Sequence, residues 1–213
     1  TGSSIALERL ISDNRYDSIL VHFLDKEMWE VLSKFEDDIE IYVWVHGSEI
    51  QPWHRREFNY QTDQERERAI LSSQKREDFW KGLLWDQPQN LHLIFVSRYF
   101  SEEVMEDYGV SLREDGYSII HNPIDTDRFV FKERKRRDRF KILSIRTFAS
   151  EKYANDISAN TILELSGRKC FKKLEFTIIG DGALYDEVTG PLERFENVTL
   201  IRGFLTNEEY EKI

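Results

Sequence analysis

The sequence predicts an α/β protein with two parallel sheets flanked by helices. Apolar segments of strand length alternate with stretches of helical periodicity along the chain, which is the pattern of strand–helix–strand units. Several strand segments are continuously apolar, as is typical of strands that helices cover on both faces. Hydrophobic residues make up 40% of the 213 residues, enough for the cores of one large or two small domains.

Seven segments are predicted to be strands. In chain order they are Asp17–Phe23, Ile39–Val45, Leu91–Val96, Tyr117–Ile120, Phe140–Ile145, Leu174–Ile179 and Val198–Ile201. Apolar residues at helical spacing predict helices over Lys26–Phe35, Phe100–Tyr108 and Ala154–Leu165. The highly charged stretch Gln61–Trp85 predicts one or two more amphipathic helices, whose closing aromatic cluster faces the core or, alternatively, a partner or a membrane.

A basic segment at 131–139 marks the expected domain boundary, because six of its nine residues are Lys or Arg. We expect a partial N-terminal domain at residues 1–130, a linker at 131–139 and a partial C-terminal domain at 140–213. A solvated linker is the simpler interpretation of this segment. The alternative is an electrostatic anchor on an anionic membrane surface, at about 1 kcal/mol per basic residue.

Composition and charge exclude several classes of protein. A net charge of −10 argues against a general nucleic-acid binder, which must neutralise phosphates. The single cysteine, Cys170, allows no intrachain disulfide, fits a reducing cytosol and is expected to be a buried or half-buried thiol. No apolar run approaches the roughly 18 residues of a membrane span, and no signal peptide is visible.

Two segments of the C-terminal domain carry candidate chemistry. The apolar strand that ends at Ile179 runs into Gly180, Asp181 and Gly182, and such glycines let a nucleotide approach the backbone, although any strand-to-helix turn can use them. Arg146 and Lys152 follow another strand. Fixed cations there could stabilise the negative charge that builds on a departing nucleotide, or could be solvated surface charges.

Two segments of the N-terminal domain are also candidates. His46, Gly47 and Glu49 follow a buried strand, where ligands of α/β sheets bind, although a lone histidine is more often structural. The next polar residues, 53–56, are expected on a surface loop or, alternatively, beside an acceptor. The stretch His121–Phe129 favours a tight turn with a short helical cap.

Taken in order, these segments resemble the retaining glycosyltransferases of family four, which have the GT-B fold of two Rossmann-like domains. The matching pieces are His46-Gly47, Val96-Ser97, Asn122–Phe129 with Pro123 where the family has Gly, Ile142–Lys152, Ile178–Gly182 and Asn197–Leu205. The resemblance covers the chain well from His46 onward, and covers the first 45 residues by fold pattern only.

The resemblance implies transfer of a hexose from a nucleotide sugar, such as a UDP- or GDP-sugar, to a glycan or lipid-linked acceptor, with retention of configuration. It implies a catalytic set of His46 on the donor sugar and Arg146 and Lys152 on the diphosphate. Further donor-binding residues would be Gly180, Asp181, Gly182, Gly203 and Phe204, with Gly47 and Glu49 on the acceptor side. No metal or other cofactor is expected, because the leaving phosphate itself helps to deprotonate the acceptor in this family.

The resemblance also implies a cytoplasmic enzyme of polysaccharide biosynthesis, possible peripheral contact with the inner membrane face, and no nucleic-acid partner. Two departures bear on it. Arg146 and Lys152 are six residues apart rather than five, and an ungapped alignment puts Arg146 where the family has Gly and Thr147 where it has Arg. The family's acidic donor motif lies beyond Ile213, so we expect a fragment that is truncated at both ends and inactive by itself.

Two other classes of function remain open from the sequence. A non-catalytic, glycosyltransferase-like subunit that stabilises a partner would fit the irregular region around Arg146. A nicotinamide-dependent oxidoreductase is disfavoured, because no G-x-G-x-x-G follows any strand and no acidic residue is placed for a ribose.

Overall fold

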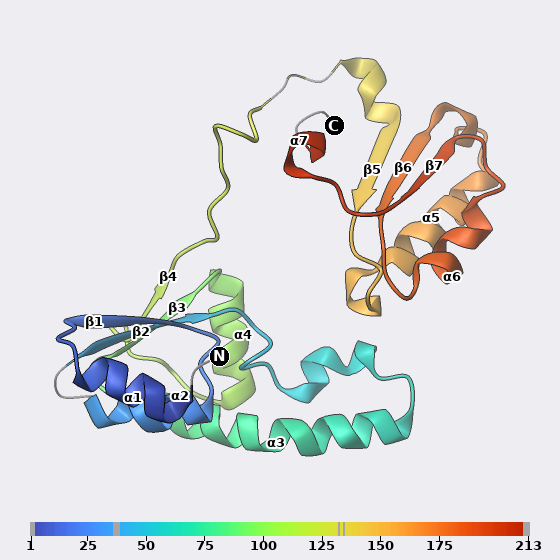
Figure 1. Ribbon diagram of the computed structural model, residues 1–213. Helices are drawn as coiled ribbons and strands as arrows, with labels where there is room; N and C mark the ends of the chain where they lie inside the picture. The colour runs from blue at the N-terminus through green and yellow to red at the C-terminus, as the bar shows by residue number, and fades with distance from the viewer. Residues whose placement is uncertain (1–2, 36–38, 132, 134, 211–213) are drawn as a thin grey trace. The chain divides into compact units, whose positions relative to one another are not determined.

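The computed structural model describes residues 3–35, 39–131, 133 and 135–210 (Figure 1). The chain divides into two compact units, Thr1–Pro123 and Ile124–Ile213, which we call unit 1 and unit 2. The division falls ahead of the basic segment 131–139. Each unit has its own sheet and its own buried cluster, so each is described by itself.

Unit 1 is built on a four-stranded parallel sheet in the order β1-β2-β3-β4. Its strands are β1 (Ser18–His22), β2 (Glu40–Val45), β3 (Leu91–Phe95) and β4 (Tyr117–Ile119). All four confirm the predicted strands to within two residues at each end. The residue that follows each strand therefore lies at one common edge of the sheet.

In the part of unit 1 that the structure describes, four α-helices and two 3-10 helices accompany the sheet. They are α1 (Ser4–Ser12), α2 (Lys26–Leu32), η1 (Ser33–Phe35), η2 (Trp53–Asn59), α3 (Asp63–Trp85) and α4 (Arg98–Tyr108). The charged stretch is one continuous helix, α3, which a capping box of Thr62 and Glu65 opens. Ser97 caps α4 through its side chain, and Gly109, with φ of 63°, ends it.

The core of unit 1 lies between its helices and one face of the sheet. Each connection moves the chain one strand further in the same direction, so crossovers of one hand place their helices on one face. Every second residue of β2, namely Ile41, Val43 and Val45, is buried in this core. They belong to the same buried cluster as side chains of the helices, including the fully buried Trp80 of α3. On the opposite face, side chains that include Tyr42 line an open groove of about 290 Å³.

Unit 2 contains a three-stranded parallel sheet in the order β5-β6-β7 (Figure 1, yellow to red). Its elements are η3 (Arg136–Phe140), β5 (Lys141–Ile145), η4 (Glu151–Tyr153), α5 (Asn155–Ser166), η5 (Phe171–Lys173), β6 (Glu175–Gly180), α6 (Tyr185–Thr189), η6 (Gly190–Leu192), β7 (Val198–Arg202) and α7 (Asn207–Tyr210). The three strands and α5 confirm the predicted segments.

The core of unit 2 gathers around β6. Phe176 and Ile178 pack with Ile162 of α5, Phe148 and the fully buried Leu192. β5 is one of the two edge strands of this sheet, and the side chains of its first three residues are exposed. The expectation of a buried or half-buried thiol was wrong, because Cys170 lies in the connection between α5 and β6 and is exposed.

Candidate functional site

The candidate residues of unit 2 gather at the carboxyl edge of its sheet. The strand register pairs Ile145 with Ile179 and Gly180 with Arg202. Beyond the last pairs, the Arg146 amide donates to the Ile179 carbonyl over 3.0 Å, and the Gly203 amide donates to the Gly180 carbonyl over 3.1 Å. Three loops distant in sequence are thereby brought together, at the edge where ligands of parallel sheets bind.

The glycines of the Gly180–Gly182 loop are required by the chain's own packing. A Cβ on Gly180 would lie 1.9 Å from the carbonyl oxygen of Arg146, and one on Gly182 would lie 2.3 Å from the carbonyl carbon of Phe148. Gly182 also has φ of 149°, which strongly favours glycine. The amide of Phe148 donates to the carbonyl of Asp181, and that of Leu184 donates to the carbonyl of Phe148, so the loops after β5 and β6 are bonded backbone to backbone.

Arg146 and Lys152 lie together on the loop after β5. The Arg146 guanidinium donates to the Tyr153 carbonyl over 3.1 Å, and the Lys152 amine lies 4.8 Å from the centroid of the Tyr153 ring. Both side chains belong to exposed residues. Within the residues that the structure describes, neither cation forms an ion pair with a carboxylate, so both charges are available to an anionic ligand.

The first turn of α5 follows these two cations directly. Ala154 precedes the helix in the left-handed conformation (φ 51°), and within the described residues no side chain caps the helix N-terminus. Asn155, which is buried, instead donates its side-chain amide to the Thr147 carbonyl and ties the helix to the loop. Amides that lack a cap and the positive end of the helix dipole both favour an anion at this point.

A third cation at this edge, Arg202, was not foreseen from the sequence. It ends β7, and its guanidinium bonds Asp181 over 2.9 Å and Asp186 over 2.9 Å while lying over the ring of Tyr185. These two acidic partners already balance its charge. Its partners come from the loop after β6 and from α6, a combination that no local spacing in the sequence indicates.

Asp181 is held as a carboxylate by its surroundings. The hydrogen bond from Arg202 and a second from the Gly182 amide lower the pKa of Asp181 below its ordinary value. A carboxylate with such partners stabilises the loop, and it does not compete for Arg146 or Lys152. Gly203 follows in the left-handed region with φ of 142°, and Phe204 is exposed beside it.

At the corresponding edge of unit 1, His46 meets a residue that the sequence did not single out. Nε2 of His46 lies 2.8 Å from Nδ1 of His22, the last residue of β1. The ring of Phe23, whose φ is 56°, stacks on His46 with the centroids 4.6 Å apart. The sequence signal for this pair is that β1 ends with His22 and that His46 directly follows β2. The two histidines can be recognised as neighbours only when the register of the two strands is known.

Gly47 and Glu49 form the turn that holds His46. Gly47 has φ of 129°, and its carbonyl accepts the amides of Ile50 and Gln51 over 3.1 and 2.8 Å. Oε1 of Glu49 accepts the backbone amide of His46, whereas Oε2 is buried and has no hydrogen-bond partner in the described part of the chain. A buried carboxylate oxygen without a partner is costly.

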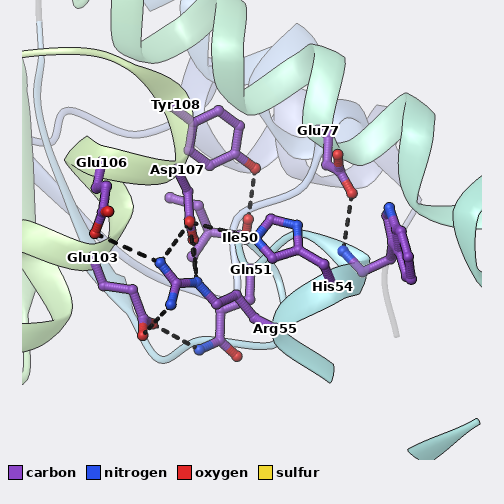
Figure 2. Close-up of polar contacts among 10 residues, drawn as sticks. Ile50, Gln51, His54, Arg55, Glu77, Glu103, Glu106, Asp107 and Tyr108 are labelled. Carbon is purple, nitrogen blue, oxygen red and sulfur yellow. Dashed lines mark hydrogen bonds and ion pairs between the residues drawn. The ribbon is translucent and has the colours of Figure 1, made fainter. Parts of the chain in front are cut away.

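The segment after His46 is fixed by an ion-pair cluster on α4 (Figure 2). Arg55 of η2 donates from Nε to both carboxylate oxygens of Asp107, over 3.0 Å each, and from a terminal nitrogen to Oδ1 over 2.7 Å. It also lies 3.5 Å from Glu103. These hydrogen bonds raise the pKa of Arg55. The buried hydroxyl of Tyr108 donates to the carbonyl of Ile50 over 2.6 Å. Residues 53–59 are therefore an anchored 3-10 helix, where the sequence had indicated a surface loop or an acceptor contact.

The segment between the last strand of unit 1 and the first strand of unit 2 contains the expected turn. Oδ1 of Asp125 accepts the amides of Asp127 and Arg128, each over 3.1 Å. Lys132 and Arg134 of the basic segment lie outside the described residues, so the membrane contact expected there stays a prediction.

Metal sites and membrane spans were sought in the described residues. No group of three or more potential ligands in them could hold a metal ion. Within the same residues, no helix has both the length and the apolar character needed to cross a bilayer.

Comparisons with known proteins gave a result for the structure and none for the sequence. No family model matches the chain, and no curated protein matches it. Among solved structures, the crystal structure of TarM matches with a TM-score of 0.60 and 15% identity, covering 97% of this chain and 36% of that one. A mutant of S. aureus TarM in complex with fondaparinux, alpha-GlcNAc-glycerol and UDP matches with a TM-score of 0.52 and 13% identity, over 96% and 36% of the two chains.

These matches settle the fold class. TarM is a glycosyltransferase of the GT-B fold, and the chain spans about a third of the length of the solved structures that it matches. At 13–15% identity, the likeness concerns the fold. The chain is an α/β protein whose two parallel sheets, flanked by helices, correspond to part of the GT-B fold.

Proposed function

We propose that this chain is part of a nucleotide-sugar-dependent glycosyltransferase and that the carboxyl edge of unit 2 binds the donor diphosphate. The observation that carries the proposal is the pair of Arg146 and Lys152. Both cations follow β5, contact a carbonyl or a ring rather than a carboxylate, and stand before the helix terminus of α5. The GT-B fold and the UDP in one TarM complex support the same interpretation.

The chemistry that this edge offers is stabilisation of a leaving group. When the bond between the sugar and the diphosphate breaks, negative charge grows on the diphosphate oxygens. Two fixed cations and the amides of α5 then interact more strongly with the transition state than with the bound donor. No metal ion is needed for this role, and none is part of the proposal.

The finer points of the proposal follow the family resemblance. We propose retention of configuration, a hexose donor and a glycan or lipid-linked acceptor. Gly180–Gly182, Gly203 and Phe204 would border the nucleotide, and His46, Gly47 and Glu49 would serve the sugar and the acceptor. Support for the latter group is the unpartnered Oε2 of Glu49, which a ligand hydroxyl could satisfy.

Ligand-dependent stability tests the proposal without requiring turnover. The thermal unfolding of the 213-residue chain would be measured by calorimetry with UDP, GDP and NAD. A nucleotide present at 100 times its Kd is expected to add about 2.7 kcal/mol to the free energy of unfolding. We expect this effect from UDP or GDP and not from NAD.

Lys152→Gln is the variant that locates the site. Loss of one charge-assisted contact, worth about 1.5–3 kcal/mol, should weaken nucleotide binding in isothermal titration calorimetry by about 10- to 100-fold. The matched control is Lys169→Gln, which removes another exposed charge after the far end of α5 and should leave the affinity unchanged.

Other outcomes would contradict the proposal. Stabilisation by NAD alone would favour a nicotinamide oxidoreductase. Absence of binding by all three nucleotides would favour the non-catalytic subunit that the irregular sequence around Arg146 also allows. Equal losses of nucleotide affinity in the Lys152 and Lys169 variants would show that the binding site does not lie at the carboxyl edge of the sheet.

A further inference from the structure

His22 and His46 are joined through their ring nitrogens at the carboxyl ends of neighbouring strands. Nδ1 of His22 and Nε2 of His46 are 2.8 Å apart, which is within hydrogen-bond distance. The ring centroids are 5.1 Å apart and the ring planes differ by 22°. The centroid separation equals the distance between the two nitrogens plus about one ring radius on each side. The two nitrogens therefore point at each other and the rings meet edge to edge, as a linear N–H···N bond requires.

The surroundings hold both rings in this position. Trp44, which is paired with His22 in the strand register, places its ring centroid 5.3 Å from that of His22 with a plane angle of 25°. Phe23 covers His46 from its own left-handed backbone position, which is uncommon for a residue with a Cβ. Among the described residues, the ring of His46 has one hydrogen bond, the one to His22.

The direction of this hydrogen bond follows from tautomer chemistry. A neutral histidine carries its proton on one ring nitrogen, and the Nε2–H form is the more stable one in water. If His46 donates from Nε2 to Nδ1 of His22, both rings keep the favoured form. If His22 donates instead, both rings must adopt the less stable Nδ1–H form.

We propose that His22 is a positioning residue that fixes His46 as the Nε2–H tautomer and leaves its Nδ1 as a hydrogen-bond acceptor. The backbone amide of His46 is already bonded to Glu49 and its Nε2 to His22, so Nδ1 is the side-chain atom that His46 offers to a ligand. An acceptor at this point selects a group that donates a hydrogen bond, and a hydroxyl of the donor sugar fits. This assignment of the ligand rests on the proposed function, whereas the tautomer does not.

Nuclear magnetic resonance of the 213-residue chain, with ¹⁵N-labelled histidine, tests the tautomer directly. The spectra would be recorded at about pH 8.5, above the ordinary pKa of histidine. His92 and His121 serve as internal references, because each places Nδ1 2.9 Å from a backbone carbonyl, which can only accept a proton. They must therefore be Nδ1–H forms, and we expect His46 to show the opposite pattern of nitrogen shifts.

The spectra also contain direct evidence of the bond itself. We expect a ¹⁵N–¹⁵N coupling across the hydrogen bond between Nε2 of His46 and Nδ1 of His22, and slow exchange of the shared proton with water. An Nδ1–H pattern for His46, or shifts averaged between the two tautomers, would overturn the proposal.

Two variants separate the hydrogen bond from packing. His22→Phe keeps an aromatic ring beside Trp44 and His46 but removes the acceptor, so the nitrogen shifts of His46 should move toward each other and its Nε2 proton should exchange faster. His22→Asn places an amide oxygen near the position of Nδ1 and should restore the wild-type pattern. An unchanged His46 in the Phe variant would contradict the positioning role. If the Phe variant does not fold, the wild-type coupling and the Asn variant decide.

A binding measurement extends the test to the ligand. His22→Phe should weaken binding of a UDP-sugar by about two- to fivefold while leaving UDP binding unchanged, because His46 is no longer held in one orientation and one tautomer, and the hydrogen bond from the sugar hydroxyl to its Nδ1 is weakened. Equal loss for both ligands, or no loss for the UDP-sugar, would reject the sugar hydroxyl as the ligand of Nδ1. Absence of both UDP and GDP binding by the wild type would count against the proposed function and leave the tautomer result standing.

Discussion

The lack of a side chain at Gly180 and Gly182 allows two loops to pack closely together. The carbonyl of Arg146 and the backbone of Phe148 occupy the space where a Cβ would lie at these two positions. A Gly-rich turn after a strand is commonly interpreted as space for a ligand. Here the space is filled by the neighbouring loop, and any ligand must approach from the other side of the turn.

Gly180→Ala is expected to destabilise unit 2. The new methyl group would overlap the Arg146 carbonyl, and overpacking of this kind typically costs about 1–3 kcal/mol. Urea unfolding followed by far-ultraviolet circular dichroism would measure the loss. Gly190→Ala is the control, because nothing lies within 4 Å of a Cβ at that position. A loss of the same size in both variants would refute the explanation by close packing.

The Asp181 carboxylate should make the stability of unit 2 depend on pH in the acidic range. Its folded-state pKa lies below the ordinary value of 3.8, so its contribution is fully present above that value and is lost as the pH falls through the folded pKa. The difference in unfolding free energy between wild type and Asp181→Asn should therefore be constant near neutral pH and shrink below about pH 4.

Denaturant titrations at several pH values would measure this difference. Glu196→Gln removes a charge from an exposed residue of unit 2 and provides the control for general charge effects. A difference between wild type and the Asp181 variant that grows on acidification would have the wrong sign for a depressed pKa.

At the scale of single residues, the sequence indicated some residues of the candidate sites and missed others, and the difference has a physical reason. Arg146, Lys152 and the Gly180–Gly182 turn follow apolar runs closely, so their place at a strand end could be predicted. Arg202 and His22 could not be distinguished from other polar residues at strand ends. Their roles depend on side chains that other strands and helices bring within reach through the register of the sheets.

At the scale of elements, η2 is a short helix that a salt bridge attaches to α4. The side chain of Asp107 is 5% exposed and that of Arg55 is 29% exposed, so this ion pair is much less accessible to solvent than the surface ion pairs of unit 1. Burial raises the pKa of the Tyr108 hydroxyl, which remains the neutral donor that fixes Ile50 just before the helix. The turn that carries His46 is thereby braced from its far end.

Arg55→Gln should loosen this brace and destabilise unit 1 by about 2 kcal/mol, because it leaves the Asp107 carboxylate buried and poorly paired. The matched control is Lys34→Gln, which breaks the exposed pair with Glu8 and should cost about 1 kcal/mol or less. Unfolding monitored by tryptophan fluorescence would compare the two. A loss in the Arg55 variant no larger than that in the control would show that the brace carries no stability.

The sequence predicted strands better than short helices. Each strand is a largely apolar run, whose pattern survives whatever packs against it. α1 was not predicted although its apolar residues recur at helical spacing, because a segment of nine residues gives too few repeats to identify a helix. η2 was expected to be a loop, because its short segment has no helical pattern of apolar residues. Their conformation depends on contacts such as that of Ile11 with the core and that of Arg55 with α4.

At the scale of the whole molecule, each unit has a separate core, and the chain provides a convenient reporter for one of them. The five tryptophans are Trp29, Trp44, Trp53, Trp80 and Trp85, and all belong to unit 1. Tryptophan fluorescence therefore reports on unit 1, whereas circular dichroism reports on both units.

A pair of core substitutions should separate the two units. Leu192→Ala and Leu93→Ala each remove a fully buried side chain, at an expected cost of about 2–5 kcal/mol. The Leu192 variant should shift part of the circular dichroism transition and leave the fluorescence transition in place, and the Leu93 variant should shift the fluorescence transition. Coincident shifts in both signals for both variants would indicate one cooperative unit instead of two.

The hydrogen bonds between the loops after β5 and β6 have a mechanical consequence. The Arg146 amide donates to the end of β6, and the amides of Phe148 and Leu184 donate across the two loops, so we expect the loops to move together. A ligand that displaced the backbone of Arg146 would therefore also displace the Gly180–Gly182 turn. The two loops would then respond to an incoming nucleotide as one unit that is attached to β5 and β6.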